Sequence, residues 1–340
     1  MDTLLRMTIL LTSVVYSLAV RVDRTPMLMP GAAPKSADTY LCYAMKLNGN
    51  VNQNLVGFLP NVSHSVHHMI LYGCPEPGSQ ERVWNCGSEM QMKHAGHDGM
   101  ADEQMDISPV CQSDEKILYA WAHNAPNFEL PEGVGFEVGG NTPIQYLVVQ
   151  LHYNDLTEEF KKGKKDHSGL TLLHTMDELP RQAGVIVMMS NGRVPAKHDE
   201  TVDIACPLME YSELHPFAYR THTHTLGRVV SGYVIQDGKW QLLGKRDPQT
   251  PQMFYPVADD KLVIKPGDTL AARCAYSNPS DHDVSMGSTM NDEMCNFYLM
   301  YWTEAPYSPI EQDSCVSLGP PYVYWETFGL KDIPADSTKL

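Results

Sequence analysis

Residues 229–243 read VVSGYVIQDGKWQLL, and this stretch decides the fold more clearly than any other. Two runs rich in β-branched and aromatic residues, which favour strands, flank the pair Asp237-Gly238. An Asp-Gly pair accepts the positive φ angles that a two-residue hairpin turn needs. The stretch therefore predicts a β-hairpin.

Short runs of the same kind recur between clusters of Gly, Pro, Asn and Asp, at 66–72, 145–153, 184–189, 228–235 and 297–302. No segment has the long apolar period of 3.6 residues, with end caps, that marks an amphipathic helix. The chain is therefore predicted to be all-β, built of antiparallel β-sandwiches.

At 340 residues the chain is long enough for two domains that each bury a core. Residues 177–180 interrupt two strand-like runs with polar side chains and a proline. We therefore predict one domain over residues 36–178 and a second over residues 179–333.

Residues 1–20 resemble a secretory signal peptide, with Arg6 before a short apolar run and Ser17-Leu18-Ala19 as a cleavage-like sequence. No other apolar run approaches the roughly 18 residues of a membrane helix, so no membrane anchor is expected. The eight cysteines predict disulfides, as is usual for secreted chains, and Asn61 begins a glycosylation sequon. We expect a protein of the secretory pathway, either in the granule lumen or secreted.

The formal net charge is −16. Nucleic-acid binding requires a basic face that displaces counterions, so a nucleic-acid partner is not expected. The basic cluster at 161–165 surrounds a glycine and is predicted to be a solvated loop.

Residues 87–110 contain four methionines and two histidines among acidic and small residues. Thioether and imidazole groups bind copper, so this insertion fits an auxiliary copper-attracting loop. The same composition also fits a disordered insertion at a loop tip, and long loops are often disordered. Both interpretations stay open.

His222 and His224 lie two residues apart in a strand-like run, so their imidazoles would share one face. Met294 stands beside Cys295, whose disulfide would hold it in place. Two imidazoles and a thioether suit copper, especially Cu(I), and leave one position for a ligand such as dioxygen. The alternative is a pair of exposed polar residues and a methionine that only fills the core.

His67 and His68 are adjacent, and neighbours on a regular strand point to opposite faces. Both reach one metal only if the backbone bends, for example at a bulge, and we expect them to bind through their nearer ring nitrogens. His152 would complete a three-imidazole site, with Gln150 on the same strand face. Three neutral imidazoles hold either oxidation state of copper, which suits electron transfer.

These motifs occur together, in the same order, in one known family. Over roughly residues 38–333 the chain resembles the peptidylglycine α-hydroxylating monooxygenases, which are copper type II, ascorbate-dependent enzymes. The resemblance is carried by Val66-His67-His68-Met69, Ile117-Leu118-Tyr119-Ala120-Trp121-Ala122, Gly133-Val134-Gly135-Phe136, Gln150-Leu151-His152-Tyr153, residues 220–227, Leu270-Ala271-Ala272-Arg273-Cys274 and Asp292-Glu293-Met294-Cys295-Asn296. It implies two jelly-roll-like sandwiches of eight or nine strands each, separated by a solvent-filled cleft, with one copper on each facing wall.

The resemblance implies hydroxylation of the α-carbon of a C-terminal glycine (EC 1.14.17.3 type), with ascorbate as reductant and dioxygen as co-substrate. Glycine-extended peptides are then the substrates, and a separate lyase completes their amidation. The implied ligands of the electron-donating copper are His67, His68 and His152. Those of the second, catalytic copper are His222, His224 and Met294.

Arg220 is the expected anchor for the terminal carboxylate, because a guanidinium group matches a carboxylate bidentately. The alternative for Arg220 is a surface ion pair of small energetic worth. The resemblance implies further substrate contacts by Tyr298, Asn296 and Met300. Gln150 is also an expected substrate contact.

The resemblance also implies the disulfides Cys42–Cys86, Cys74–Cys111, Cys206–Cys315 and Cys274–Cys295. Family members often have a further bridge that ends near residues 165–168, where this chain has His167 instead. We therefore expect a looser N-terminal arm.

Three alternatives stay open. A dopamine or tyramine β-monooxygenase resembles the same core, but it carries an extra N-terminal domain and needs no Arg220. A secreted copper carrier would explain the insertion at 87–110, but it needs no substrate anchor. A zinc hydrolase would require an acidic general base at a useful spacing from the histidines, and the sequence shows none.

Overall fold

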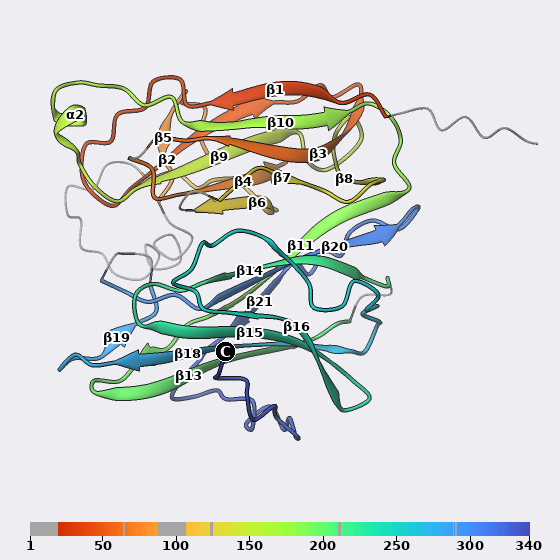
Figure 1. The fold of residues 1–340 in the computed structure, drawn as a ribbon. Coiled ribbons are helices and arrows are strands. Elements are labelled where there is room, and N and C mark those ends of the chain that lie inside the picture. The colour runs from red at the N-terminus through yellow and green to blue at the C-terminus, as the bar shows by residue number, and fades with distance from the viewer. Residues whose placement is uncertain are drawn as a thin grey trace, which may run out of the picture.

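The computed structural model describes residues 20–63, 65–87, 107–122, 125–209, 212–287, 289 and 291–340. These residues form two β-sandwiches, one above the other in Figure 1, and the predicted all-β fold is confirmed. One short helix, α2 (Glu158–Lys161), lies between strands. None of the helices in the described residues is long and apolar enough to cross a membrane. The predicted signal peptide and most of the insertion lie outside the described residues.

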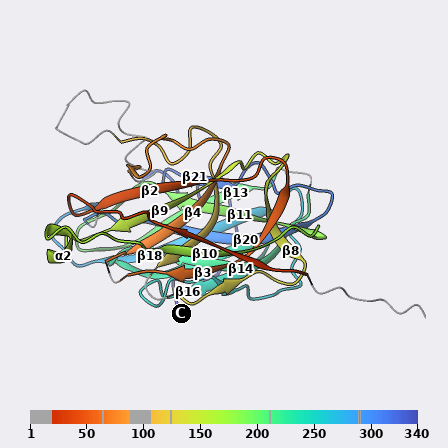
Figure 2. The same cartoon turned by 90° about the horizontal axis from the view of Figure 1, so that it is seen from above.

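The N-terminal sandwich packs a five-stranded sheet, in the order β5-β2-β9-β4-β6, against the first part of a ten-stranded sheet. Figure 2 shows these strands from above, lying over those of the other sandwich. The strands are β1 (Asp23–Leu28), β2 (Thr39–Lys46), β3 (Asn52–Asn61), β4 (His68–Cys74), β5 (Trp84–Asn85), β6 (Lys116–Ala122), β7 (Phe128–Glu129), β8 (Val134–Gly139), β9 (Tyr146–Tyr153) and β10 (Gly169–Thr175).

The C-terminal sandwich packs a four-stranded sheet, in the order β13-β18-β15-β16, against the rest of the ten-stranded sheet. Its strands are β11 (Arg181–Ser190), β12 (Arg193–Val194), β13 (His198–Pro207), β14 (His215–His222), β15 (Gly227–Gln236), β16 (Lys239–Arg246), β17 (Tyr255–Pro256), β18 (Thr269–Asn278), β19 (Val284–Ser285), β20 (Asn296–Glu304) and β21 (Ser314–Ser317).

The ten-stranded sheet continues from one sandwich into the other. Its order is β1-β10-β3-β8-β11-β20-β14-β17, and a short parallel pairing of β8 with β11 joins the two halves. Strand β1 lies before residue 36, the predicted start of the first domain, and pairs with β10 along its whole length. The chain crosses between the sandwiches from Thr175 to Arg181.

The predicted hairpin at 229–243 is confirmed. Strands β15 and β16 pair antiparallel, with Gln236 opposite Lys239. The φ angles of Asp237 and Gly238 are 50° and 74°, so both turn residues adopt the positive values that match the twist of the strands. The other strand-like runs overlap β4, β9, β11, β15 and β20.

All four predicted disulfides are present: Cys42–Cys86, Cys74–Cys111, Cys206–Cys315 and Cys274–Cys295. The last two join β13 and β18 of the four-stranded sheet to β21 and the residue before β20 in the opposite sheet. Cross-links of this kind reduce the freedom of the unfolded chain, and the last one also fixes the backbone next to Met294.

The two sandwiches, which the resemblance places on either side of a solvent-filled cleft, touch along part of their facing walls. The ring of Phe254 lies 6.1 Å from that of Tyr119 and 5.5 Å from that of Phe128, between centroids. Ala218 and Met300 belong to the same buried cluster as the N-terminal core. Apolar side chains on both walls bury each other, which favours contact over an open cleft.

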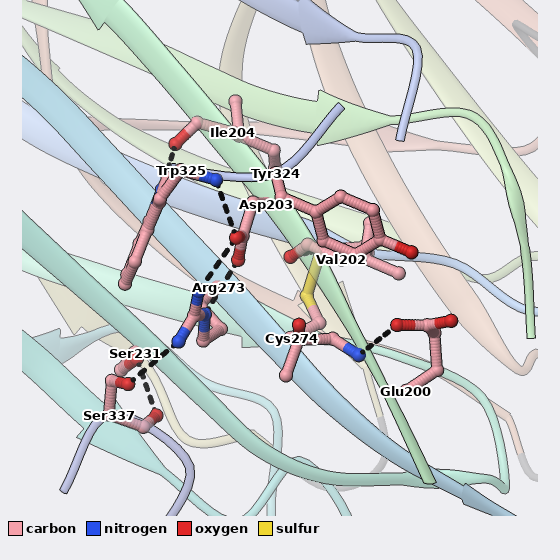
Figure 3. Close-up of polar contacts among 12 residues, drawn as sticks. Glu200, Val202, Asp203, Ile204, Ser231, Arg273, Cys274, Tyr324, Trp325 and Ser337 are labelled. Carbon is pink, nitrogen blue, oxygen red and sulfur yellow. Dashed lines mark hydrogen bonds and ion pairs between the residues drawn. A yellow bond between two sulfur atoms is a disulfide. The ribbon is translucent and has the colours of Figure 1, made fainter. Parts of the chain in front are cut away.

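The C-terminal segment, residues 318–340, covers the outer face of the four-stranded sheet and is held by a buried ion pair (Figure 3). The Nε and Nη2 atoms of Arg273 donate to the two carboxylate oxygens of Asp203 at 2.6 and 2.7 Å. The amide of Trp325 donates to the same carboxylate at 2.8 Å, and Arg273 also reaches Ser337. Because the paired charges are fully hydrogen-bonded, they tie this segment to the sheet.

Candidate functional site

The three N-terminal histidines lie together at one end of the five-stranded sheet. His68 begins β4 and stands opposite His152 of β9, while the backbone amide of His67 donates to the carbonyl of His152 at 2.9 Å. One ring nitrogen from each of the three lies within 4.8 Å of those of the other two. The backbone bend that the doublet requires comes from the start of β4 at His68, not from a bulge inside the strand.

The arrangement of the ring nitrogen atoms in this group fits a metal ion. The Nδ1 atoms of His67 and His68 face each other at 3.2 Å. The Nε2 atom of His152 bonds to the carboxylate of Asp38 at 3.2 Å, and its Nδ1 atom is buried with no hydrogen-bond partner among the residues that the structure describes. A buried nitrogen without a partner is costly unless something binds it, and a carboxylate behind a ligand histidine is a common supporting contact.

The protonation of these histidines also suits metal binding. Burial, reinforced by the neighbouring His152 and His67, lowers the pKa of His68 well below its ordinary value. Burial lowers the pKa of His152 as well, against the opposing effect of Asp38. Neutral imidazoles present a lone pair, so at neutral pH these side chains are ready to bind a soft cation.

The second group is built on the pairing of β14 with β20. In that register Arg220 stands opposite Tyr298, and His222 stands opposite Asn296. Arg220 and His222 share a strand face, as predicted, but β14 ends at His222, so His224 lies beyond the strand. The two imidazole rings still lie 5.4 Å apart between centroids.

Hydrogen bonds fix which nitrogen of each imidazole is free. The Nδ1 atom of His222 bonds to the side-chain oxygen of Gln252 at 2.5 Å, and that of His224 bonds to the carbonyl of Asp292 at 2.8 Å. Both partners accept only, so Nδ1 carries the proton and Nε2 keeps its lone pair. Met294 lines the same cavity as His222. Two Nε2 atoms and a thioether are a donor set that fits copper.

Glu293 connects the backbones of this second group. It is 1 % exposed, and its carboxylate accepts hydrogen bonds from the amides of His224 at 2.9 Å, Leu226 at 2.6 Å and Met294 at 3.3 Å. The hydroxyl of Tyr276 also donates to the carbonyl of Met294 at 2.5 Å. Burial raises the pKa of Glu293, although the three amide bonds oppose the shift.

Arg220 is a buried cation without an acidic partner. It is 3 % exposed, donates from Nε and Nη2 to the carbonyl and side-chain oxygens of Gln252, and lies 5.0 Å from the centre of the Tyr298 ring. Among the described residues, no carboxylate forms an ion pair with it. The alternative of a surface ion pair for Arg220 is therefore wrong.

A small cavity of about 80 Å³ lies between the two groups. Its lining includes most of the predicted site residues, namely His68, Gln150, Arg220, His222, Met294, Asn296 and Tyr298. Met300 is not part of this lining, because it is fully buried in the core next to Ala218. The amide of Gln150 donates to the carbonyl of Gly87 at 2.9 Å.

The two groups approach each other closely. The rings of His68 and His222 lie 6.3 Å apart between centroids. Burial, and then the charge of Arg220, lower the pKa of His222 well below its ordinary value. Burial therefore keeps the facing imidazoles neutral, and one cavity is lined by His68, a predicted ligand of the first metal, and by His222 and Met294, predicted ligands of the second.

Sequence reasoning missed Asp38, Gln252 and Glu293. An acid beside Met294 was a readable signal for Glu293, because such a side chain can bond to the backbone of its neighbours. Asp38 and Gln252 gave no signal, since their contacts depend on how distant strands pair.

Comparison with known proteins agrees with this geometry. The family description "Copper type II ascorbate-dependent monooxygenase, N-terminal domain" matches residues 26–159, and the corresponding C-terminal domain matches residues 181–328. The chain belongs to the copper type II, ascorbate-dependent monooxygenases. The two matches together cover both groups of histidines, Arg220 and Met294.

Within this family, amidating enzymes are more similar to the chain than amine enzymes. It is 39 % identical over 310 residues to peptidyl-glycine alpha-amidating monooxygenase A of Xenopus laevis, covering 90 % of the chain and 31 % of that protein. It is 42 % identical over 284 residues to peptidylglycine alpha-amidating monooxygenase of Rattus norvegicus, covering 82 % of the chain and 27 % of that protein. It is 28 % identical over 299 residues to dopamine beta-hydroxylase of Homo sapiens, covering 80 % of the chain and 44 % of that protein. The chain thus spans about a third of the length of the amidating relatives.

Proposed function

We propose that this chain hydroxylates the α-carbon of the C-terminal glycine of peptides, using copper, ascorbate and dioxygen, in the first step of peptide amidation. The observation that carries the proposal is the environment of Arg220. This buried guanidinium group lines the cavity beside His222 and Met294 and pairs with no carboxylate of the described residues.

A buried charge without a counter-charge is costly. The terminal carboxylate of a peptide would supply that counter-charge and would bind to the fork of the guanidinium group. The ammonium group of an amine substrate would instead meet a like charge, which disfavours binding. Arg220 therefore supports a carboxylate-ended substrate over an amine.

The position of Arg220 also places the reacting atom. It lies two residues before His222 on the same strand face, a separation of about 7 Å along the strand. The α-carbon of a terminal glycine is bonded directly to the carboxylate carbon. A peptide held at Arg220 would therefore present that α-carbon beside the second metal site, with Tyr298 and Asn296 on the opposite strand as further contacts.

We assign the electron-donating copper to His67, His68 and His152. The second copper is assigned to His222, His224 and Met294. When bound, the two ions would supply one-electron transfer and the activation of dioxygen, with ascorbate as the reductant. The contribution of the protein is to orient the imidazoles through Asp38, Gln252 and the Asp292 carbonyl, and to exclude water by closing the walls.

The proposal extends to processing and location. Four disulfides favour an oxidising compartment, in agreement with a signal peptide at residues 1–20 and a secretory location. Asn61 is exposed at the end of β3, where a glycan could be attached. The hydroxylated product would pass to a lyase activity. Residues 36–178 and 179–333 are proposed as the two copper domains.

Oxygen uptake tests the proposal. Purified protein with copper and ascorbate is given N-acetylphenylalanylglycine or, in a parallel reaction, tyramine. The expected result is oxygen uptake with the peptide and a product that gains one oxygen atom at the glycine. Uptake with tyramine alone would point to an amine hydroxylase, and uptake with neither substrate would point to a copper carrier.

A further inference from the structure

Gln252 contacts both the expected substrate anchor and an expected metal ligand. It lies in the loop between β16 and β17, and the pairing of β17 with β14 at Tyr219 brings this loop beside Arg220 and His222. The carbonyl oxygen of Gln252 accepts from Nε of Arg220 at 2.9 Å. Its side-chain oxygen accepts from His222 at 2.5 Å and from Nη2 of Arg220 at 3.4 Å.

The orientation of the Gln252 amide is determined by its other end. The Nε2 atom donates to the carbonyl of Pro248 at 3.0 Å and to that of Thr223 at 3.3 Å. An amide nitrogen donates and an amide oxygen accepts, so the oxygen must point to His222 and Arg220. The proton of His222 then lies on Nδ1, and the lone pair of Nε2 is left for the metal.

We propose that Gln252 is a positioning residue that couples the carboxylate anchor Arg220 to the metal ligand His222. Through one side chain it fixes the tautomer of the imidazole, and through the same loop it fixes the direction of the guanidinium fork. The distance between the peptide carboxylate and the second metal is therefore set by Gln252. The claim about Arg220 rests on the proposed function. The claim about His222 rests on the hydrogen-bond geometry alone.

Two substitutions separate this role from simple loop anchoring. Gln252→Met removes both the acceptor and the donors with little change in side-chain volume. Gln252→Glu keeps an oxygen that accepts from His222, but it places a carboxylate against Arg220. A loop anchor would lose its Pro248 and Thr223 bonds in both variants and respond alike in both. Gln241→Met, on β16, is the control, because the side-chain amide of Gln241 donates to Gln236 of the same hairpin, away from both metal groups.

The experiment uses the full chain loaded with Cu(II), without ascorbate, so that no turnover occurs. Electron paramagnetic resonance during titration with a chelator measures the affinity of each copper. Calorimetry measures the binding of N-acetylphenylalanylglycine and of its carboxamide, which lacks the charge that Arg220 would bind. Thermal denaturation reports folding for each variant.

We expect Gln252→Met to weaken the second copper about tenfold and to reduce the preference for the carboxylate peptide, with the first copper unchanged. Gln252→Glu should keep the second copper within about threefold, yet weaken the carboxylate peptide at least tenfold, which corresponds to about 1.4 kcal/mol. The inference would be overturned if both variants lowered the affinities for copper and for the peptide equally, in parallel with a fall in Tm. It would also be overturned if both variants kept the wild-type affinities. If the wild-type protein showed no preference for the carboxylate peptide, the proposed function would be refuted, and with it the claim that Gln252 orients the substrate anchor Arg220. The copper titration would still decide whether Gln252 orients the metal ligand His222.

Discussion

Replacing Arg220 by methionine should abolish the preference for a terminal carboxylate without unfolding the protein. The guanidinium group is 3 % exposed and has only uncharged partners, namely Gln252 and the ring of Tyr298. Its bond to a peptide carboxylate would be charge-assisted and worth about 1.5 to 3 kcal/mol. That range corresponds to roughly 10- to 150-fold in kcat/KM. Because the substitution also removes a buried, unpaired charge, we expect Tm to stay the same or to rise.

A double-mutant cycle measures this energy directly. The rates of oxygen uptake are compared for wild type and Arg220→Met, each with N-acetylphenylalanylglycine and with its carboxamide. The effect of the substitution should be large with the carboxylate and small with the amide, leaving a coupling energy of about 1.5 to 3 kcal/mol. A coupling energy near zero would show that Arg220 does not bind the terminal carboxylate, and the main support for the proposed function would be lost.

The other predictions concern the metal sites. Met294→Ile should abolish oxygen uptake, and it should lower the free energy of unfolding by less than about 1.5 kcal/mol because it conserves side-chain volume. Metal analysis should find the first copper retained, and a variant that still hydroxylates the peptide would exclude Met294 as a ligand. Burial lowers the pKa of His68 and His222 below the value of about 6.5 in the unfolded chain, so the copper-free protein should be most stable above about pH 6.5. As pH falls from about 6.5 toward the lower folded values, each group should remove about 1.4 kcal/mol per pH unit, and a Tm that is flat from about pH 8 to about pH 5 would contradict the burial of these rings. Asp38→Asn should weaken the first copper about tenfold by removing the carboxylate behind His152, and chelator titration should show the second copper unchanged.

The sequence predicted what depends on neighbours in the chain. The turn at Asp237-Gly238 could be read directly, because only a few residue pairs accept two positive φ angles in succession. The strand assignments followed from β-branched and aromatic runs for the same local reason. The disulfides and the two sets of ligands came from the resemblance to a family, and the structure shows all four disulfides.

What the sequence could not predict depends on contacts between distant strands. Phe254, in a loop with no strand signal of its own, packs on Tyr119 and Phe128 of the opposite sandwich, and this contact could not be read from the sequence. Met300 was an expected substrate contact by resemblance, and it lies deeper along the same strand face as Asn296 and Tyr298, inside the core. Strand alternation gives the face of a residue, but not where along that face a cavity ends.

The register of β14 against β20 explains why this site favours one kind of substrate. The anchor Arg220 and the ligand His222 are consecutive residues on one face, and Tyr298 and Asn296 stand directly opposite them. A slip of β14 by one residue would turn Arg220 and His222 to the other face of the sheet, away from Tyr298 and Asn296. Two features accompany this register. The disulfide Cys274–Cys295 fixes the residue before β20, and β14 has a register shift between Pro216 and Ala218. The separation of carboxylate anchor and metal therefore depends on the backbone ladder as well as on Gln252. Substrates of other lengths between carboxylate and reacting carbon, such as β-alanine-extended peptides, should be poor substrates even when they bind.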